Sequence, residues 1–439
     1  MTVDARIVSL QGRQIFDSRG RPTVEVDVAL SGGATGRASA PSGASTGRYE
    51  AHELRDGDPS AYGGRGVRNA GRHVDGEIAS ALAGRSASDQ ALIDTLLRDL
   101  DGTENLGRLG ANAVLATSLA VCRAAAHAHA MPLYRHIACL AGNEELSLPM
   151  PMINILSGGA HAGRSMDVQD FLIVPVAAND FGDALRMALG VRHAADEVLA
   201  RRGLKTLLAD EGGLSPGCKT ADDAMDIVTE AIVAAGYEPG RDIAIAIDVA
   251  ASELFAYGAY ELRNEGRRLT SEQMITMVAG WLERYRVISI EDALHQDDWE
   301  NWARLTSVAA NVQLVGDDLF ATNPSRIAHG IRMRAGNAVL IKPNQNGTLS
   351  GTLDALAQAR SGGFTTIVSA RSGETEDPFI ADLAVGTGAG QIKIGSVRTS
   401  ERMAKYNRLV RIAQDRTIPF AGAHCFGGLR PRPTAWAAC

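Results

Sequence analysis

The stretch RVISIEDAL, residues 286–294, is a short apolar run that stops on two acidic residues, Glu291 and Asp292. A run of this length that is rich in β-branched residues is typical of a strand buried on both faces. The preceding segment, SEQMITMVAGWLERY (271–285), has the apolar spacing of an amphipathic helix. A helix followed by a buried strand predicts one unit of a parallel sheet covered by helices.

The same pattern recurs along the chain from about Pro149. The further runs are IAIAIDVA (243–250), VQLVGDDLF (312–320), AVLIKPN (338–344), FTTIVSARS (364–372) and QIKIGS (391–396). Strand and helix units repeated six times favour a sheet that closes into a barrel. The predicted fold class is therefore α/β, with a barrel domain at residues 141–439.

The first 140 residues are organised differently. Two alternating runs, RIVSLQGRQIFDS (6–18) and PTVEVDVAL (22–30), predict strands joined by a turn. A Gly/Ser-rich loop, APSGASTGRYE (40–50), follows them, and helical patterning then extends from about Asn69 to about Leu140. This succession predicts an N-terminal α+β domain at residues 1–140, and a chain of 439 residues is long enough for two domains.

Composition narrows the class of protein. The net charge of −7 argues against a surface for nucleic acid or for an anionic membrane. The five cysteines are odd in number and form no CxxC pair, which indicates free thiols in a reducing compartment. The most apolar stretch, residues 113–130, is interrupted by Arg123 and favours a buried helix over a membrane span. We expect a cytoplasmic protein with no nucleic-acid or membrane partner.

Each of the six strand-like runs carries polar or charged residues at or near its end. In chain order they are Asp248, Glu291, Asp317, Lys342, Arg371 with Ser372, and Lys393. Strands commonly stop on a charged residue where they meet solvent, so one such residue would mean little. The carboxyl ends of barrel strands meet at one face, however, and six in succession, acids before cations, predict a single active site there.

The chemistry of these residue types indicates a reaction. Asp248, Glu291 and Asp317 offer only oxygen ligands, the set that Mg²⁺ prefers. Only five of the 44 basic residues are lysines, and lysine, unlike arginine, readily gives up its proton. A cation beside Lys342 would disfavour the protonated amine and make it a general base. A base beside a Mg²⁺-bound carboxylate predicts removal of the α-proton, that is, enolisation.

The chain resembles the enolase family over nearly its whole length. The stretches that carry the resemblance are FDSRGRPTVEV, PSGASTG, ELRDGD, DLDGTENLGRLGANAVLATSLA, GGAHAG, ADEGGLSP, DVAASE, SIEDAL, QLVGDDLF, LIKPNQNGTL, RSGETEDP and GQIKIGS. The resemblance implies an enolase-type modified TIM barrel, an N-terminal α+β capping domain and two Mg²⁺ ions per active site. It also implies a homodimer or higher homo-oligomer and a small phosphorylated or phosphonylated carboxylic acid as substrate.

The resemblance also implies roles for individual residues. Those assigned to the metal ions are Asp248, Glu291, Asp317 and, for the second Mg²⁺, Ser45 of the lid loop. Those assigned to catalysis are Lys342 as the base, with Glu211, Asp170 and His161 near the departing group. Those assigned to the substrate are Gln169, Lys393 for its carboxylate, and Arg371 and Ser372 for its phosphate.

Four positions depart from the family pattern. Asp170 replaces glutamate, Ala370 replaces histidine, Ser157 replaces asparagine and Asn346 replaces isoleucine. The metal ligands and the base are unchanged. Random decay would alter them as readily as their neighbours, so the distribution favours a site rebuilt for a related substrate. Glutamate to aspartate withdraws a carboxylate by about one methylene, and a displacement of about 1 Å can cost on the order of a hundredfold in rate.

The predicted function is an Mg²⁺-dependent lyase that forms an enolpyruvate. The departures favour a diverged paralogue, such as a carboxyphosphonoenolpyruvate synthase of phosphonate natural-product biosynthesis. Two alternatives stay open. One is an ordinary enolase that converts 2-phosphoglycerate to phosphoenolpyruvate and water in glycolysis, and the other is a catalytically silent binding protein on the same fold.

Overall fold

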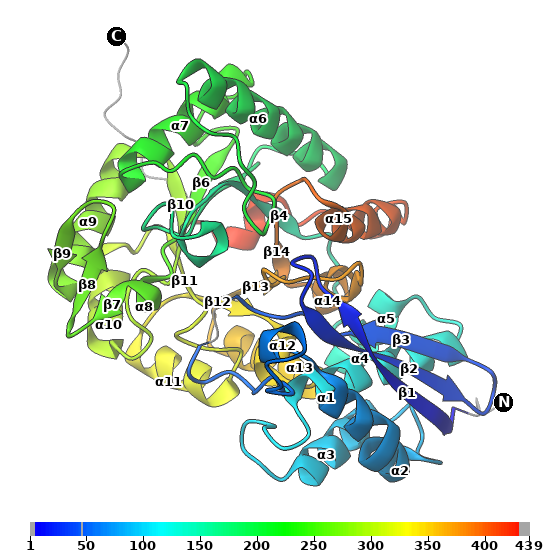
Figure 1. Ribbon diagram of the computed structural model, residues 1–439. Coiled ribbons are helices and arrows are strands. Elements are labelled where there is room, and N and C mark those ends of the chain that lie inside the picture. The colour runs from blue at the N-terminus through cyan, green and yellow to red at the C-terminus, as the bar shows by residue number, and fades with distance from the viewer. Residues whose placement is uncertain (1–4, 45–46, 430–439) are drawn as a thin grey trace.

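The computed structural model describes residues 5–44 and 47–429 and shows two domains packed side by side (Figure 1). The N-terminal domain begins with an antiparallel sheet in the order β1-β2-β3. Its strands are β1 (Ile7–Phe16), β2 (Pro22–Leu30) and β3 (Thr35–Ser39). The two strands predicted from alternation are confirmed as β1 and β2, whereas the short β3 was not predicted.

The helices of this domain pack on the sheet, chiefly through α4, or on one another. They are α1 (Arg68–His73), which continues through a π turn (Val74–Ile78) into α2 (Ala79–Leu82), then α3 (Gln90–Asp101), α4 (Ala111–Ala128) and α5 (Leu133–Ala141). The alanine-rich α4 is buried against β2 and β3. Gly36 makes this close packing feasible, because a Cβ there would lie 2.2 Å from the carbonyl oxygen of Ala120. The apolar 113–130 stretch is therefore the buried helix that its composition predicted.

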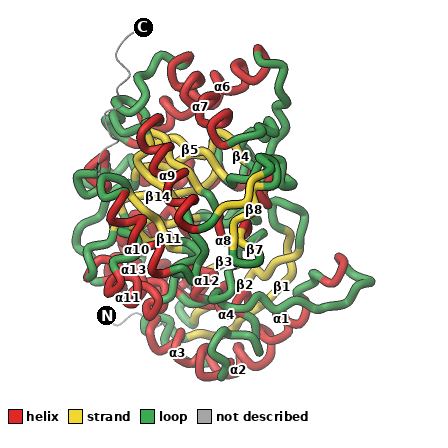
Figure 2. Tube along the Cα trace, turned by 90° about the vertical axis from the view of Figure 1, so that its left-hand side faces the viewer, coloured by secondary structure: helices red, strands yellow, loops and turns green. Residues whose placement is uncertain are grey.

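The C-terminal domain is a closed barrel with the strand order β10-β11-β12-β13-β14-β4-β5-β6. The strands are β4 (Met150–Ser157), β5 (Asp170–Val174), β6 (Ala244–Asp248), β10 (Val287–Glu291), β11 (Gln313–Gly316), β12 (Ala338–Ile341), β13 (Thr365–Ser369) and β14 (Gly390–Gly395). Figure 2 shows these strands enclosed by helices. The predicted α/β class and barrel closure are confirmed.

One strand does not follow the parallel order expected from the repeated pattern. β5 is antiparallel to both of its neighbours, β4 and β6. Two consecutive helices, α6 (Phe181–Arg201) and α7 (Ala221–Ala234), then precede β6. The expectation of a purely parallel sheet was wrong here, because an apolar run such as DFLIV is buried on both faces and does not encode its direction. This is the modified barrel that the resemblance implied.

The remaining elements surround the barrel. The larger helices are α9 (Ser271–Arg284), α10 (Trp299–Val308), α11 (Pro324–Met333), α13 (Leu349–Ser361), α14 (Phe379–Thr387) and α15 (Ser400–Ile412). The smaller elements are α8 (Ala251–Leu254), α12 (Pro343–Asn346) and the antiparallel strands β7 (Phe255–Ala256), β8 (Ala259–Leu262) and β9 (Arg267–Leu269). Within the described residues, 3-10 turns lie at Tyr62–Gly64, Gly159–Ala162 and Gly422–Phe426.

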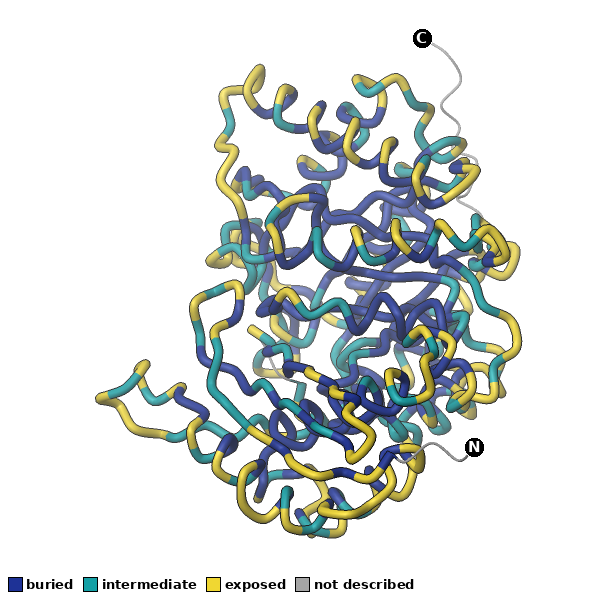
Figure 3. The backbone as a smooth tube through the Cα atoms, turned by 90° about the vertical axis from the view of Figure 1, so that its right-hand side faces the viewer, coloured by how far each residue is buried: buried dark blue, intermediate teal, exposed yellow. Residues whose placement is uncertain are grey.

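The barrel strands are buried, and most exposed residues lie on the outer helices, the loops and the strands outside the barrel (Figure 3). A compact apolar cluster lies within the strand layer, and Phe426 from the last 3-10 turn belongs to it. Over the described ranges, no helix combines the length and apolar character needed to cross a bilayer.

The two domains meet at the start of α13. Asp94 Oδ2 accepts a hydrogen bond from the backbone N–H of Ser350 at 2.8 Å, and Ser118 Oγ accepts one from Leu349 at 3.0 Å. Arg98 donates to the backbone carbonyl of Asn346 at 3.1 Å and also contacts its side-chain carbonyl. Residues of the N-terminal domain thus satisfy free N–H groups at a helix start in the barrel domain. The departure at Asn346 belongs to this contact.

Candidate active site

Lys393 bridges two of the carboxylates at the barrel mouth. Its Nζ donates to Asp248 Oδ2 at 2.8 Å and to Glu291 Oε2 at 2.7 Å. Asp248 and Glu291 are the last residues of the adjacent strands β6 and β10 and lie opposite each other in register. Lys393 is the fourth residue of β14 and lies two residues before the strand ends at Gly395, so it points inward from the wall.

Burial and neighbouring charges shift the pKa values of both Glu291 and Lys393. Burial raises the pKa of Glu291 well above its usual value, and the charge of Asp248 raises it further. Burial alone would lower the pKa of Lys393, but the carboxylates of Asp248 and Glu291 raise it well above the ordinary lysine value. The lysine therefore stays charged and neutralises much of the repulsion between the two acids.

Lys342 follows β12 and pairs with Asp317, which follows β11. The other oxygen of Asp317 accepts a hydrogen bond from Gln345 Nε2 at 2.8 Å. Burial would lower the pKa of Lys342, but the Asp317 carboxylate raises it above its usual value. A role as base therefore requires that the charge of Asp317 be engaged by another cation.

Among the described residues, the acids grouped closely enough to share one cation include Asp317 but not Asp248 and Glu291, the other two predicted ligands, which Lys393 bridges instead. Asp292, Asp317 and Asp318 each offer an oxygen within 4.8 Å of the others. Asp292 also accepts the backbone N–H groups of Asp317 at 3.0 Å and Asp318 at 2.8 Å, which fixes this turn. In addition, Glu291 Oε1 is buried without a hydrogen-bond partner among the described residues. Crowded hard oxygen donors with an unused buried oxygen are suited to Mg²⁺.

Asp318 provides a prediction about pH. Its pKa is raised to about 7, because burial and the charge of Asp317 disfavour ionisation. The folded pKa lies above the unfolded value, so the contribution of Asp318 to stability is full at low pH and is lost as pH rises through about 7. We expect Asp318→Asn in EDTA to gain ~1–2 kcal/mol of unfolding free energy at pH 8 and less at pH 5, measured by urea unfolding.

The control is Asp354→Asn, an exposed carboxylate on α13. Its substitution should leave the pH profile of urea unfolding unchanged. An equal gain at both pH values for Asp318→Asn would contradict the prediction.

The end of the site that was predicted to bind an anion contains residues of both domains. Arg371 NH1 donates to Glu50 Oε2 at 2.7 Å and to Asn344 Oδ1 at 3.1 Å. Ser372 Oγ accepts a hydrogen bond from Arg19 NH1 at 3.1 Å. Glu50 and Arg19 come from the N-terminal domain, and sequence reasoning missed both because neither belongs to the strand-end pattern that indicated the site.

Glu50 provides a second prediction, on anion binding. Its carboxylate forms an ion pair with the guanidinium of Arg371, so an anionic ligand has to share that guanidinium with Glu50 or displace the Glu50 carboxylate. We expect Glu50→Gln to bind inorganic phosphate about tenfold more tightly in isothermal titration, since the amide competes less well for the cation. The control is Glu53→Gln, whose carboxylate accepts from Ser42 and Arg55 instead. Weaker binding by Glu50→Gln would show that Glu50 orients Arg371.

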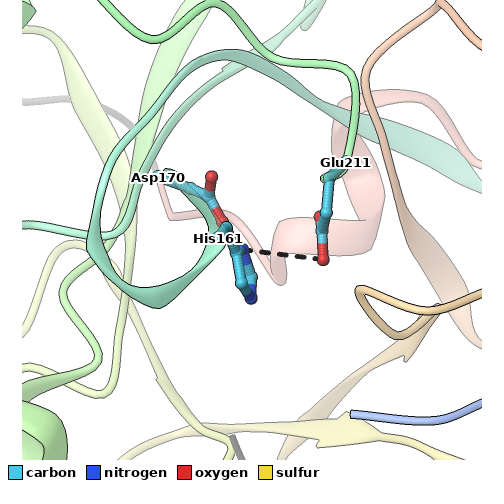
Figure 4. A group of neighbouring side chains, drawn as sticks. All are labelled: His161, Asp170 and Glu211. Carbon is cyan, nitrogen blue, oxygen red and sulfur yellow. Dashed lines mark ion pairs between the residues drawn. The ribbon is translucent and has the colours of Figure 1, made fainter. Parts of the chain in front are cut away.

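Three side chains from separate segments form the third part of the site (Figure 4). His161 lies in the 3-10 turn after β4, Asp170 opens β5, and Glu211 lies in the loop between α6 and α7. His161 Nδ1 is 3.4 Å from Asp170 Oδ2 and 3.8 Å from Glu211 Oε1. Because β5 is antiparallel to its neighbours, its first residue, rather than its last, reaches the mouth.

The surroundings shift the pKa values of the two carboxylates of this trio in opposite directions. Burial raises the pKa of Asp170. Burial has the same effect on Glu211, but His161 and Arg402 outweigh it and lower that pKa. Burial would lower the pKa of His161, yet the charge of Glu211 raises it. Two nearby acids with opposite shifts are typical of sites in which one group holds a proton and the other does not.

The three parts of the site surround one small cavity of about 30 Å³. Its walls include predicted site residues from all of them: His161, Gln169, Glu211, Asp248, Asp317, Lys342, Arg371, Ser372 and Lys393. Gln169 Nε2 donates to Asp248 Oδ2 at 3.1 Å. Glu291 and Asp170 lie directly behind the wall, in contact with Lys393 and His161. Ser45, the predicted lid ligand, lies outside the described residues.

Two protein-family models match the chain. The one described as "Enolase, N-terminal domain" matches residues 7–137. The one described as "Enolase, C-terminal TIM barrel domain" matches residues 145–427. The matched ranges contain the cap, the barrel and the described site residues, and together they cover most of the 439 residues. This chain therefore belongs to the enolase family.

Proposed function

We propose that the protein is an Mg²⁺-dependent lyase that removes the proton α to a substrate carboxylate and releases an enolpyruvate. The observation that carries this proposal is the convergence of Lys342 and Lys393 with the carboxylates of Asp248, Glu291 and Asp317 at one mouth. A base beside a charge-stabilised carboxylate is the arrangement that enolisation requires.

Each residue then has a defined task. Asp248, Glu291 and Asp317 would hold Mg²⁺, and Ser45 would reach a second ion. Bound Mg²⁺ supplies the positive charge that stabilises the enolate. Lys393 orients the substrate carboxylate, and Lys342 Nζ takes the α-proton. Arg371 and Ser372 hold the phosphorus-bearing group at the opposite end.

We further propose that the substrate differs from 2-phosphoglycerate in its phosphorus substituent. The observation that favours this is Ala370, which lines the cavity directly before Arg371 and offers only a methyl group. A methyl group there takes up less space than the histidine of the family pattern, so the cavity of about 30 Å³ would have to widen less to hold a larger group beside Arg371. Carboxyphosphonoenolpyruvate synthesis in a phosphonate pathway fits this substitution, and an ordinary glycolytic enolase is the alternative.

The test is α-proton exchange in D₂O with Mg²⁺, followed by NMR for 2-phosphoglycerate and for its carboxyphosphono counterpart. Exchange and elimination of the carboxyphosphono compound, with slow turnover of 2-phosphoglycerate, would support the altered substrate. A kcat for 2-phosphoglycerate of about 10–10² s⁻¹ would support an ordinary enolase. Failure of both compounds to exchange would indicate a silent binding protein.

A further inference from the structure

Two of the positions that depart from the enolase pattern contact each other. Ser157, the last residue of β4, lies opposite Asp170, the first residue of β5, in the antiparallel ladder. The Ser157 hydroxyl donates a hydrogen bond to Asp170 Oδ1 at 2.6 Å. Both residues are fully buried. The two replacements therefore form one hydrogen-bonded unit rather than two separate changes.

β4 holds both carboxylates of this part of the site in the same way. Asn154 Nδ2 donates to Glu211 Oε2 at 3.1 Å, as Ser157 donates to Asp170 Oδ1. The other oxygens, Glu211 Oε1 and Asp170 Oδ2, face His161 Nδ1. Each carboxylate thus has one oxygen fixed by the strand and one directed toward the histidine.

Two atoms directed toward the middle of the trio can still form hydrogen bonds. Asp170 Oδ2 and His161 Nδ1 are both buried without a hydrogen-bond partner among the described residues. These two atoms lie 3.4 Å apart as an ion pair, and His161 lines the cavity with Asp170 behind it, so a ligand group bound beside His161 would complete their hydrogen bonding. Gly213 leaves space for the Ser157 hydroxyl, because a Cβ at residue 213 would lie 2.4 Å from its oxygen.

We propose that Ser157 is a positioning residue for Asp170 and that the pair controls elimination of the β-substituent separately from α-proton removal. The inference rests on the proposed function. Lys342 takes the α-proton, the electrons of that bond form the double bond, and the bond from the β-carbon to its oxygen breaks. The departing oxygen takes a proton from the His161, Asp170 and Glu211 side, where the Ser157 hydrogen bond fixes the direction of Asp170.

The test is a double-mutant cycle with Ser157→Ala and Asp170→Asn in the full-length protein with Mg²⁺. The substrate is 2-phosphoglycerate or its carboxyphosphono counterpart, whichever of the two the wild type eliminates. We expect Ser157→Ala to lower kcat for elimination about tenfold, while KM and the α-proton exchange rate stay within about twofold. In the Asp170→Asn background the same substitution should have no further effect. The matched control is Ser289→Ala, a buried strand hydroxyl that bonds Gln313 away from the trio.

Equal losses in exchange and elimination, or the same loss in both backgrounds, would overturn the inference. A crystal structure of Ser157→Ala tests it independently of turnover. The Asp170 carboxylate should rotate from its present position once its hydroxyl partner is removed, and an unchanged carboxylate would overturn the proposal. A wild type without Mg²⁺-dependent exchange would refute the proposed function, and this structural comparison would still decide whether Ser157 fixes Asp170.

Discussion

Lys342→Ala is expected to lower kcat for enolpyruvate formation by about 10²–10⁴-fold, the range usual for a general base. The reason is positional, since Lys342 Nζ lies at the cavity wall beside Asp317 and would be the group that receives the α-proton. Exchange of the α-proton in D₂O should fall by the same factor, because exchange and elimination share that first step. Steady-state assay and NMR exchange on the same preparation check both expectations.

The control for this substitution is Lys219→Ala, because Lys219 is exposed and does not line the cavity. It should leave both rates unchanged. Retention of exchange by Lys342→Ala would mean that another group removes the proton, and enolisation by Lys342 would then have to be abandoned.

Lys393→Met is expected to lower the free energy of unfolding by about 3–5 kcal/mol in EDTA, because it leaves two buried carboxylates without their shared cation. Lys393 is 5% exposed and contacts both Asp248 and Glu291. Added Mg²⁺ should restore much of the loss, since a divalent ion can neutralise the same oxygens. Urea unfolding with EDTA or with Mg²⁺ measures both effects.

The pH dependence of this loss follows from the raised pKa of Glu291. A carboxyl whose folded pKa exceeds its unfolded value binds more protons in the folded state, so stability falls as pH rises. The penalty in Lys393→Met should therefore shrink at acidic pH. The matched control is Lys405→Met, an equally buried lysine that donates to the Thr375 carbonyl and pairs with Glu374. It should lose stability with no recovery in Mg²⁺, whereas equal behaviour of the two variants would contradict a metal site at Asp248 and Glu291.

Much of the barrel and its mouth could be predicted from the sequence for a definite physical reason. A buried strand is a short apolar run, and Glu291 or Lys342 directly after such a run marks where it reaches the mouth. β4 and β5 were not among the six predicted runs, and the antiparallel direction of β5 left no signal, because a strand buried on both faces lacks the alternation of a half-exposed antiparallel strand. The short strands β7–β9 were missed for a related reason, since two to four residues are too few for a period.

The contacts within the site were harder to predict than the residue types. Glu50 belongs to another domain, and only the packing of that domain on the barrel brings it to Arg371. Ser157 and Asp170 were recognised from sequence as separate departures, because their hydrogen bond depends on the strand register. Residue chemistry could thus be derived from local pattern, whereas pairing requires the tertiary structure.

The antiparallel connection between β4 and β5 also has a consequence for engineering. Asn154, Ser157, His161 and Asp170 all lie on one continuous stretch of 17 residues, and of that trio and its strand contacts only Glu211 lies elsewhere. A single cassette swap of residues 154–170 with a homologue would therefore exchange four of these five residues and leave Glu211 in place. The proposed metal ligands and the two site lysines would remain in the recipient protein. Assays of such chimeras would therefore separate the effect of this stretch on substrate preference from its effect on the catalytic rate.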